Sequence, residues 1–124
     1  MRLWSLIAVI LLLGATVPAT PALARPEGTS PATIKEIALA ELPREAQQTL
    51  QAIKRGGPFA FERDGVVFGN YERRLPPRSR GYYREYTVPT PGVRSRGARR
   101  LIAGRGGEYY YTDDHYRTFR RIRE

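Results

Sequence analysis

Apolar residues recur at two different spacings along this chain. Between residues 43 and 55 they return every three or four positions, the spacing of a helix that buries one side. Pro43 suits a first helical position, and the Gly56-Gly57 pair supplies a stop. The pattern therefore predicts one helix that begins near Pro43 and ends before Gly56. Its buried side would consist of Leu42, Ala46, Thr49, Leu50 and Ile53.

From residue 58 onward, short runs of β-branched and aromatic residues are separated by turns. The stretch GPFAFERDGVVF predicts a loop, a turn at Asp64-Gly65 and a short strand, and RRLPPRSRG (residues 73–81) predicts a polar loop. Residues 34–42 are ambiguous and could hold another short strand. Further strands are expected at Tyr82–Val88, Arg99–Ala103, Tyr109–Thr112 and Tyr116–Ile122.

One early helix followed by several strands is typical of the α+β class, and 124 residues allow one small domain. We expect one main N-terminal helix packed on one face of an antiparallel sheet of about five strands. The second face of such a sheet often contacts water, which leaves it free to carry a site.

The first 24 residues have the organisation of a secretory signal peptide. Arg2 precedes about a dozen mostly apolar residues, and Ala22-Leu23-Ala24 forms a small-x-small cleavage pattern. The apolar run is shorter than the roughly 20 residues that span a membrane. We expect cleavage of residues 1–24 after about Ala24, a secreted protein and no stable membrane insertion. Residues 25–35 are expected to form a flexible lead-in, and residues 36–124 the folded domain.

The charge balance is strongly basic. The chain has 21 basic and 12 acidic residues, and without residues 1–24 it keeps 20 basic against 12 acidic residues, a net charge of +8. A secreted domain of this charge is expected to meet polyanions such as RNA, DNA, acidic envelope polymers or anionic lipid. With no cysteine and one histidine, thiol chemistry and Cys- or His-rich metal sites are excluded, so we expect no metal and no cofactor.

The candidate chemistry lies in YYREYTVPTPGVRSRGARR, residues 82–100. A single carboxylate, Glu85, sits in the best predicted strand, and a Pro/Gly turn and an arginine cluster follow it. Two strands joined by that turn would place Glu85 near Arg100 on one face, and Arg96 shares the parity of Arg100 if the segment between them is regular. A carboxylate beside guanidinium groups stays ionised and can accept a proton, and the guanidinium groups can hold a phosphate and stabilise its developing charge.

His115, in YTDDHYRTF, is the only histidine, and histidine is the residue type that titrates near neutral pH. With Glu85, Arg96 and Arg100 it completes a set able to cleave RNA by transesterification. A base takes the proton of the 2′-hydroxyl, the arginines hold the phosphate, and an acid protonates the leaving 5′-oxygen. Taken alone, the same residues would also fit a surface ion pair and a solvated histidine.

The stretches LPREAQQTLQAI, GPFAFERDGVVFGNYERRLP, GYYREYTVPTPGVRSRGARRLI and EYYYTDDHYRTF cover nearly all of residues 42–119. Together they closely resemble the small guanyl-specific microbial ribonucleases, the group that includes barnase and the secreted ribonucleases of actinomycete type. The resemblance implies the microbial ribonuclease fold and a metal-independent endoribonuclease that prefers guanosine. It implies cleavage 3′ of G to a 2′,3′-cyclic phosphate, followed by hydrolysis to a 3′-phosphate.

The resemblance also implies roles for individual residues. Glu85 matches the general base, His115 the general acid, and Tyr116 a tyrosine that lines the phosphate site. Arg96 and Arg100 match the phosphate-binding arginines. Residues 67–72 match a guanine-binding loop, in which backbone N–H groups, a stacked aromatic ring and a carboxylate read the base.

The implied base-binding residues are Phe68, Gly69, Asn70, Tyr71 and Glu72. Glu72 would accept hydrogen bonds from guanine N1–H and N2–H₂. Two alternatives stay open at this point. Phe68 could instead belong to the core, and Glu72 could pair with Arg73 or Arg74.

RNA is thus the expected partner, a barstar-like acidic inhibitor is a second partner that the resemblance suggests, and a monomer is the default state. The alternative function is a non-catalytic cationic protein that binds RNA or another polyanion, or acts on membranes, through its arginines alone. Glu85 and His115 discriminate between the two, because a pure polyanion binder needs neither.

Overall fold

The computed structural model describes residues 14–16, 18 and 33–124. The predicted signal peptide over residues 1–24 and the lead-in over residues 25–35 therefore lie almost entirely outside the described residues. Within the described ranges, no helix is long and apolar enough to cross a membrane. Both N-terminal assignments stay predictions.

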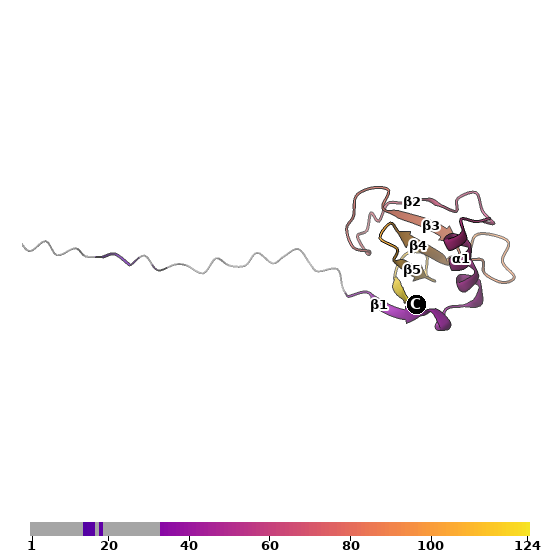
Figure 1. Ribbon diagram of the computed structural model, residues 1–124, viewed down its shortest axis with the longest axis horizontal. Helices are drawn as coiled ribbons and strands as arrows, with labels where there is room; N and C mark the ends of the chain where they lie inside the picture. Colours follow the sequence, from indigo (N-terminus) through magenta and orange to yellow (C-terminus); the bar gives the residue numbers. More distant parts are fainter. Residues whose placement is uncertain (1–13, 17, 19–32) are drawn as a thin grey trace, which may run out of the picture.

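Residues 33–124 form one α-helix and a six-stranded sheet, which confirms the α+β class (Figure 1). The elements are β1 (Lys35–Ala38), a 3₁₀ turn (Leu39–Glu41), α1 (Arg44–Arg55), β2 (Val66–Phe68), β3 (Tyr83–Thr87), β4 (Arg100–Gly104), β5 (Tyr109–Thr112) and β6 (Arg120–Arg123). The strand order is β1-β6-β5-β4-β3-β2. Neighbouring strands are antiparallel except β1 and β6, which run parallel.

The additional strand, β1, comes from the segment that the sequence left ambiguous. It pairs with β6 from Lys35 opposite Arg120 to Ala38 opposite Arg123. The pairing begins one residue before the expected domain boundary at residue 36. It makes the sheet six-stranded and one of its edges parallel, where the sequence predicted an antiparallel sheet of about five strands.

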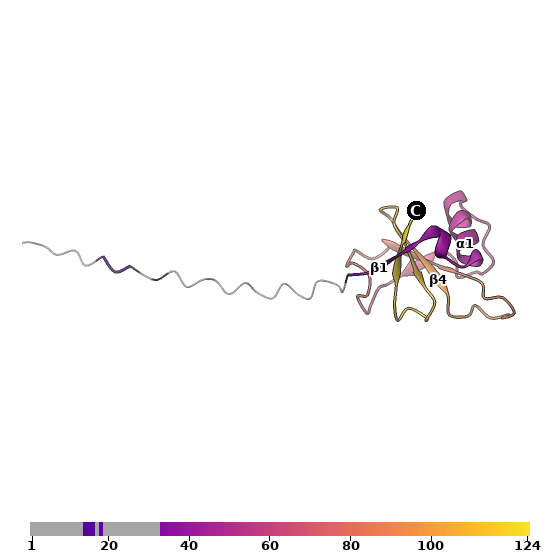
Figure 2. The same ribbon diagram turned by 90° about the horizontal axis from the view of Figure 1, so that it is seen from below.

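The helix α1 agrees with its sequence pattern. Pro43 precedes its first turn, where the missing N–H costs no hydrogen bond, and Gly56 ends it in the left-handed region at φ 84°. Ala46 and Leu50 form one buried cluster with Leu101 of the sheet. Figure 2 shows α1 to one side of the sheet, so the helix covers only one face.

The second face of the sheet is partly covered by a smaller core. Its buried members from the strands are Tyr83, Ile102 and Tyr110, and the loops add Leu75 and Phe119. Leu75 is fully buried, although the sequence marked its segment only as a polar loop. Burial of a Leu side chain contributes about 1.5–3 kcal/mol, so Leu75 fixes this loop on the sheet. The same face also carries the polar side chains of Glu85, Thr87 and Arg100.

The last strand begins four residues later than predicted, at Arg120 and not at Tyr116. In the intervening segment the backbone bonds to side chains and not to a neighbouring strand. The N–H of Tyr116 donates to Thr112 Oγ1 at 3.2 Å, and the N–H of Thr118 donates to Asp114 Oδ1 at 2.9 Å. Such local hydrogen bonds compete with strand pairing, so the strand prediction for residues 116–119 was wrong.

Candidate active site

The polar part of the second face holds two buried charges on neighbouring strands. In the β3–β4 ladder, Thr87 lies opposite Arg100, and Glu85 lies opposite Ile102. Opposite residues share a face, which confirms the prediction that Glu85 and Arg100 do so. Glu85 is 7% exposed and Arg100 is 3% exposed. Charged side chains are rarely buried unless they are paired, so their partners define the site.

Each carboxylate oxygen of Glu85 has one donor. Arg96 Nη2 donates to Oε1 at 3.3 Å, and the Tyr116 hydroxyl donates to Oε2 at 2.9 Å. Arg96 also donates from Nε to Thr87 Oγ1 at 3.0 Å. Arg96 reaches the carboxylate from the loop between β3 and β4. Since this segment is not a regular strand, the predicted parity of Arg96 with Arg100 does not explain its position. The carboxylate is held in place and keeps lone pairs that can accept a proton.

Arg100 is held by the backbone around it. Its Nη1 donates to the carbonyl oxygens of Arg96 at 3.3 Å, Gly97 at 2.9 Å and Arg99 at 2.8 Å. Its Nε donates to the Tyr116 hydroxyl at 3.0 Å. Within residues 33–124, no hydrogen bond uses Nη2. The loop thus fixes a buried positive charge with one nitrogen available to an anion.

Tyr116 joins this charged cluster, which we define as Glu85, Arg96, Arg100 and Tyr116, to the neighbouring loop. Burial raises the pKa of Tyr116, and the charge of Glu85 raises it further. The hydroxyl therefore stays protonated and keeps donating to the carboxylate. The Tyr116 ring stacks on Phe68, with centroids 5.2 Å apart and planes 19° apart.

His115 lies at the edge of the charged cluster. Its ring centroid is 4.9 Å from that of Tyr116, and its side chain is exposed. Its N–H donates to the Ala98 carbonyl at 3.0 Å, which joins the His115 loop to the arginine loop. His115 and Tyr116 both have left-handed backbone, at φ 55° and φ 70°. Such conformations are uncommon outside glycine and concentrate at functional sites.

Asp114 holds this left-handed turn in shape. Its Oδ1 accepts hydrogen bonds from the Thr112 hydroxyl at 2.9 Å and the Thr118 N–H at 2.9 Å, and its Oδ2 accepts from the Thr118 hydroxyl at 2.6 Å. Burial alone would raise the pKa of Asp114, but these hydrogen bonds outweigh it and lower the pKa to about 2. Asp114 is therefore a structural support for His115 and Tyr116.

The predicted guanine-binding loop follows β2, and Asn70 holds it to Leu75. Asn70 Nδ2 donates to the Leu75 carbonyl at 2.9 Å, and the Leu75 N–H donates to Asn70 Oδ1 at 3.1 Å. Asn70 has left-handed backbone at φ 50°. The Asn70 side chain is thus used within the loop itself. The backbone of Asn70 remains available to form a hydrogen bond with a base.

Glu72 lies on the exposed tip of this loop and has an ion-pair partner. Arg74 Nε donates to its Oε2 at 2.7 Å, and Arg74 Nη2 lies 2.7 Å from the same oxygen as an ion pair. This is one of the two pairings that the sequence left open. Oε1 of Glu72 has no hydrogen bond within residues 33–124 and can accept one from a ligand.

Tyr71 is 82% exposed and lies across Gly69. A Cβ at Gly69 would approach the Tyr71 ring to 2.5 Å, so a larger residue there would displace the ring. The Tyr71 hydroxyl accepts a hydrogen bond from Arg80 Nη1 at 2.9 Å. Next to it is a cavity of about 130 Å³, lined by Phe68, Asn70, Tyr71, Glu72, Arg74, Tyr116 and Phe119.

Phe68 contacts both the core and the base cavity, the two positions that the sequence left open for it. It packs against the smaller core, with its ring centroid 5.9 Å from that of Phe119. It also lines the cavity beside Glu72 and stacks on Tyr116. One ring therefore supports the core and offers a surface to a planar ligand.

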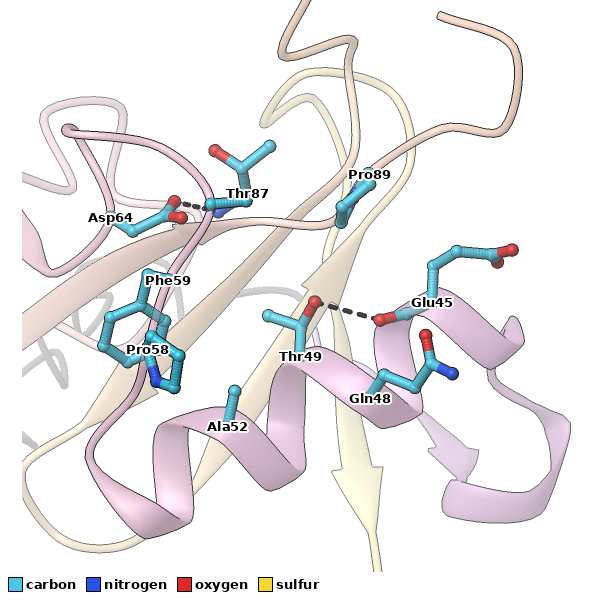
Figure 3. A pocket seen from close by; sticks show the side chains of 10 residues that line it. Glu45, Gln48, Thr49, Ala52, Pro58, Phe59, Asp64, Thr87 and Pro89 are labelled. Carbon is cyan, nitrogen blue, oxygen red and sulfur yellow. Dashed lines mark hydrogen bonds between the residues drawn. The ribbon is translucent and has the colours of Figure 1, made fainter.

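A second cavity, of about 210 Å³, lies between α1 and the segment before β2 (Figure 3). Of its two acidic lining residues, Glu45 and Asp64, Asp64 is held by the backbone, because Oδ1 accepts the Thr87 N–H at 2.7 Å and Oδ2 accepts the Phe61 N–H at 3.1 Å. The Gly65 N–H donates to the Glu85 carbonyl at 2.8 Å. This region therefore fixes the strand that carries Glu85.

Several residues that support the site were not predicted from the sequence. Thr87 could have been found, because it shares the strand parity of Glu85. Asp64 and Asp114 gave no such indication, because their contacts depend on loop geometry. Nowhere in the described part of the chain do three or more His, Cys, Asp or Glu side chains gather as metal ligands would.

The comparisons with known proteins agree with this geometry. Residues 25–123 match the ribonuclease family. Guanyl-specific ribonuclease St of Saccharopolyspora erythraea is 52% identical over 86 residues, which are 69% of this chain and 85% of that protein. Guanyl-specific ribonuclease Sa of Kitasatospora aureofaciens is 56% identical over 84 residues, which are 67% of this chain and 88% of that protein.

A solved structure of ribonuclease Sa2 in complexes with mononucleotides superposes with a TM-score of 0.74 and 46% identity, over 75% of this chain and 97% of that one. Ribonuclease Sa2 has also been solved with guanosine-2′-cyclophosphate and with 3′-GMP. This chain therefore belongs to the microbial guanyl-specific ribonuclease family, as its sequence motifs predicted.

Proposed function

We propose that this protein is a guanyl-specific endoribonuclease that cleaves single-stranded RNA on the 3′ side of guanosine. The observation that carries the proposal is the position of the charged cluster directly beside the Phe68–Glu72 cavity, with Tyr116 in both. A reacting phosphate bound at the charged cluster and a base bound in this cavity belong to one nucleotide. The chain is 52–56% identical to two guanyl-specific ribonucleases, which supports the same activity.

The first step is a transesterification. Glu85 accepts the proton of the 2′-hydroxyl, the 2′-oxygen bonds to phosphorus, and the bond from phosphorus to the 5′-oxygen breaks. His115 gives its proton to the leaving 5′-oxygen, so the products are a 2′,3′-cyclic phosphate and a free 5′-hydroxyl. In the second step His115 takes a proton from water and the water oxygen bonds to phosphorus. The bond from phosphorus to the 2′-oxygen breaks, and Glu85 returns its proton to that oxygen to leave a 3′-phosphate.

The arginines stabilise the charge that grows on the phosphate. Arg100 is already fixed by three carbonyl oxygens and Tyr116, so little reorganisation is needed when the charge develops. Arg96 contacts Glu85 at 3.3 Å, a long hydrogen bond that an entering phosphate can replace. Neither role requires a metal.

Glu72 and the backbone of residues 69–71 read the base. Guanine presents N1–H and the N2 amino group as adjacent donors, whereas adenine presents an acceptor at N1. Oε1 of Glu72 is available to these donors, and Oε2 can be shared with Arg74. The rings of Phe68 and Tyr71 line the same cavity and offer stacking surfaces.

Digestion of defined dinucleotides by residues 25–124 in EDTA tests the proposal. We expect GpU to be cleaved much faster than ApU, UpU and CpU, with a 2′,3′-cyclic phosphate that appears first and a 3′-phosphate that follows. Tight binding of RNA without any cleavage would contradict the proposal and favour the alternative, a cationic polyanion binder.

Residues 1–24 support secretion of the protein with cleavage after about Ala24, which N-terminal sequencing of exported protein tests. The basic site suits a small acidic, barstar-like inhibitor that occupies the phosphate position, and the protein is proposed to act as a monomer. Sedimentation of the mature chain, alone and with candidate acidic proteins, measures both.

A further inference from the structure

A groove with cationic walls lies next to the base cavity. It has a volume of about 460 Å³ and its lining includes Lys35, Arg74, Arg117 and Arg120 but no carboxylate. We call it the upstream groove. It lies at the end of the sheet where β1 and β6 begin, away from α1.

The upstream groove is continuous with the base cavity, because Arg74 and Phe119 line both. Arg74 also donates from Nη1 to the carbonyl oxygen of Arg117, which ties the base-binding loop to the wall of the groove. A chain that leaves the base cavity on this side passes directly along the four cationic side chains.

Part of the positive charge in the groove is uncompensated. Arg74 pairs with Glu72, and Arg120 lies 3.9 Å from Asp113. Lys35 and Arg117 are exposed, and within residues 33–124 neither has a carboxylate in ion-pair distance. An Arg and a Lys that have no carboxylate partner among residues 33–124, next to the base cavity, favour a phosphate as ligand.

We propose that the upstream groove binds the phosphates of RNA on the 5′ side of the recognised guanosine. The proposal rests on the proposed function, which places the 3′ phosphate at the charged cluster. Phe68 stacks on Tyr116 of that cluster, and both line the base cavity, which shares Arg74 and Phe119 with the groove. The 3′ strand leaves from the cluster, so the strand that continues past the base cavity is the 5′ strand. The groove then makes the enzyme prefer guanosines inside a longer RNA.

The test compares GpU with UpUpGpU, extended on the 5′ side, and GpUpUpU, extended on the 3′ side. Wild-type protein is compared with the double variant Lys35→Ala/Arg117→Ala, which keeps the Arg117 carbonyl that Arg74 uses. The control is Arg44→Ala/Arg123→Ala, which removes two exposed charges outside the lining of the groove.

We expect wild-type kcat/KM to be higher for UpUpGpU than for GpU, and this ratio to fall by about three- to tenfold in the groove variant, as for the loss of two exposed charge contacts. In the groove variant, the slope of the logarithm of this ratio against the logarithm of salt concentration should become less steep by about 0.7 per lost phosphate contact. The control variant should keep the wild-type ratio. No gain from the 5′ extension, an equal loss for GpUpUpU, or an equal loss in the control would overturn the proposal.

Binding of the same oligomers with 2′-deoxyguanosine gives a second readout, because they lack the attacking hydroxyl. A failure of the proposed function would appear as binding without cleavage of the ribo-oligomers. A failure of the groove would appear as equal affinity of wild type and groove variant for the 5′-extended deoxyguanosine oligomer, whether or not the protein cleaves RNA.

Discussion

The charged cluster and the base loop, residues 69–74, differ in how their side chains are held. In the charged cluster, Glu85 and Arg100 are buried, and each forms a hydrogen bond with the Tyr116 hydroxyl. In the base loop, Tyr71 is 82% exposed and the side chain of Glu72 is 71% exposed. The charged cluster, which is proposed to stabilise the charge of the transition state, is fixed before substrate binds. The side chains proposed to bind the base are hydrated and lose this water when the base binds.

The exposed tip of the base loop nevertheless stands on a fixed foundation. Asn70 and Leu75 hold the loop closed, and the Leu75 side chain is fully buried. The exposed side chains of Tyr71 and Glu72 thus stand on a fixed backbone. Variants in the two regions should therefore separate turnover from base preference.

The largest effect is expected from Glu85→Gln in the charged cluster. The amide has no basic oxygen to take the 2′-hydroxyl proton, so turnover of GpU should fall by about 10²–10⁴-fold. The fold should survive, because the amide oxygen can still accept a hydrogen bond from Tyr116. Steady-state cleavage of GpU and thermal unfolding measure the two effects.

Glu108→Gln is the matched control for Glu85→Gln. Glu108 accepts a hydrogen bond from the Tyr82 hydroxyl at 2.7 Å and lies outside the charged cluster, so its variant should keep turnover. His115→Gln should lose a factor similar to that of Glu85→Gln, with little change in stability, because the His115 side chain is exposed. Near-wild-type turnover in a folded Glu85 variant would remove that residue from the chemistry.

Arg100→Lys tests whether fixed geometry matters beyond charge. A lysine keeps the positive charge but cannot replace the contacts of Nε and Nη1 together. We expect turnover to fall by about 10²-fold, the usual cost of removing one preorganised donor. The free energy of unfolding should fall by about 2 kcal/mol, because partly buried carbonyl groups lose their donor.

Arg96→Lys provides the comparison for Arg100→Lys. Arg96 is partly exposed and none of its hydrogen bonds goes to the backbone within residues 33–124, so a smaller loss of stability is expected. Equal effects of the two substitutions on turnover and unfolding would show that the backbone contacts of Arg100 add nothing.

The sequence predicted the parts of the fold that follow from local periodicity. The helix, the strand β3 and the shared face of Glu85 and Arg100 all come from spacing of 3.6 or 2 residues. The pairing of β1 with β6 joins distant segments, and no local pattern specifies it. Leu75 is one apolar residue in a charged loop, and its burial depends on the sheet that receives it.

The sequence predicted candidate site residues, whose roles stay predictions, but not the contacts that hold them. The resemblance named Glu85, Glu72 and His115, and the structure shows what orients them. His115 and Tyr116 adopt left-handed backbone although neither is glycine, and their sequence gives no indication of it. Of the two candidate partners for Glu72, only the loop geometry selects Arg74.

Glu72→Ala should change base preference more than turnover on other dinucleotides. Without the carboxylate, guanine N1–H and N2–H₂ lose an acceptor, so kcat/KM for GpU should fall by about 10- to 100-fold while ApU changes little. The ratio of GpU to ApU cleavage measures the effect, with Glu62→Ala as an exposed acidic control outside the loop. Unchanged discrimination would assign the reading of the base to the backbone of residues 69–71.

The smallest expected effect concerns Asp114 and acid stability. Its folded pKa is about 2 against an ordinary value of 3.8, so the unfolded chain binds more protons between these values. Its contribution to stability is therefore present above about pH 4 and is lost as the pH falls toward 2. Asp114→Asn removes this titration.

Between pH 5 and pH 2, the free energy of unfolding should consequently fall by about 1 kcal/mol less in Asp114→Asn than in wild type, after allowance for solvent screening. At pH 7 the variant should be less stable, because an amide replaces the acceptor of the Thr118 N–H and hydroxyl. Asp113→Asn is the control, since Asp113 is exposed and its ion pair with Arg120 is 3.9 Å long. Urea unfolding at the two pH values measures all three proteins, and identical acid losses for wild type and Asp114→Asn would show that the hydrogen bonds to Thr118 do not stabilise the turn that carries His115.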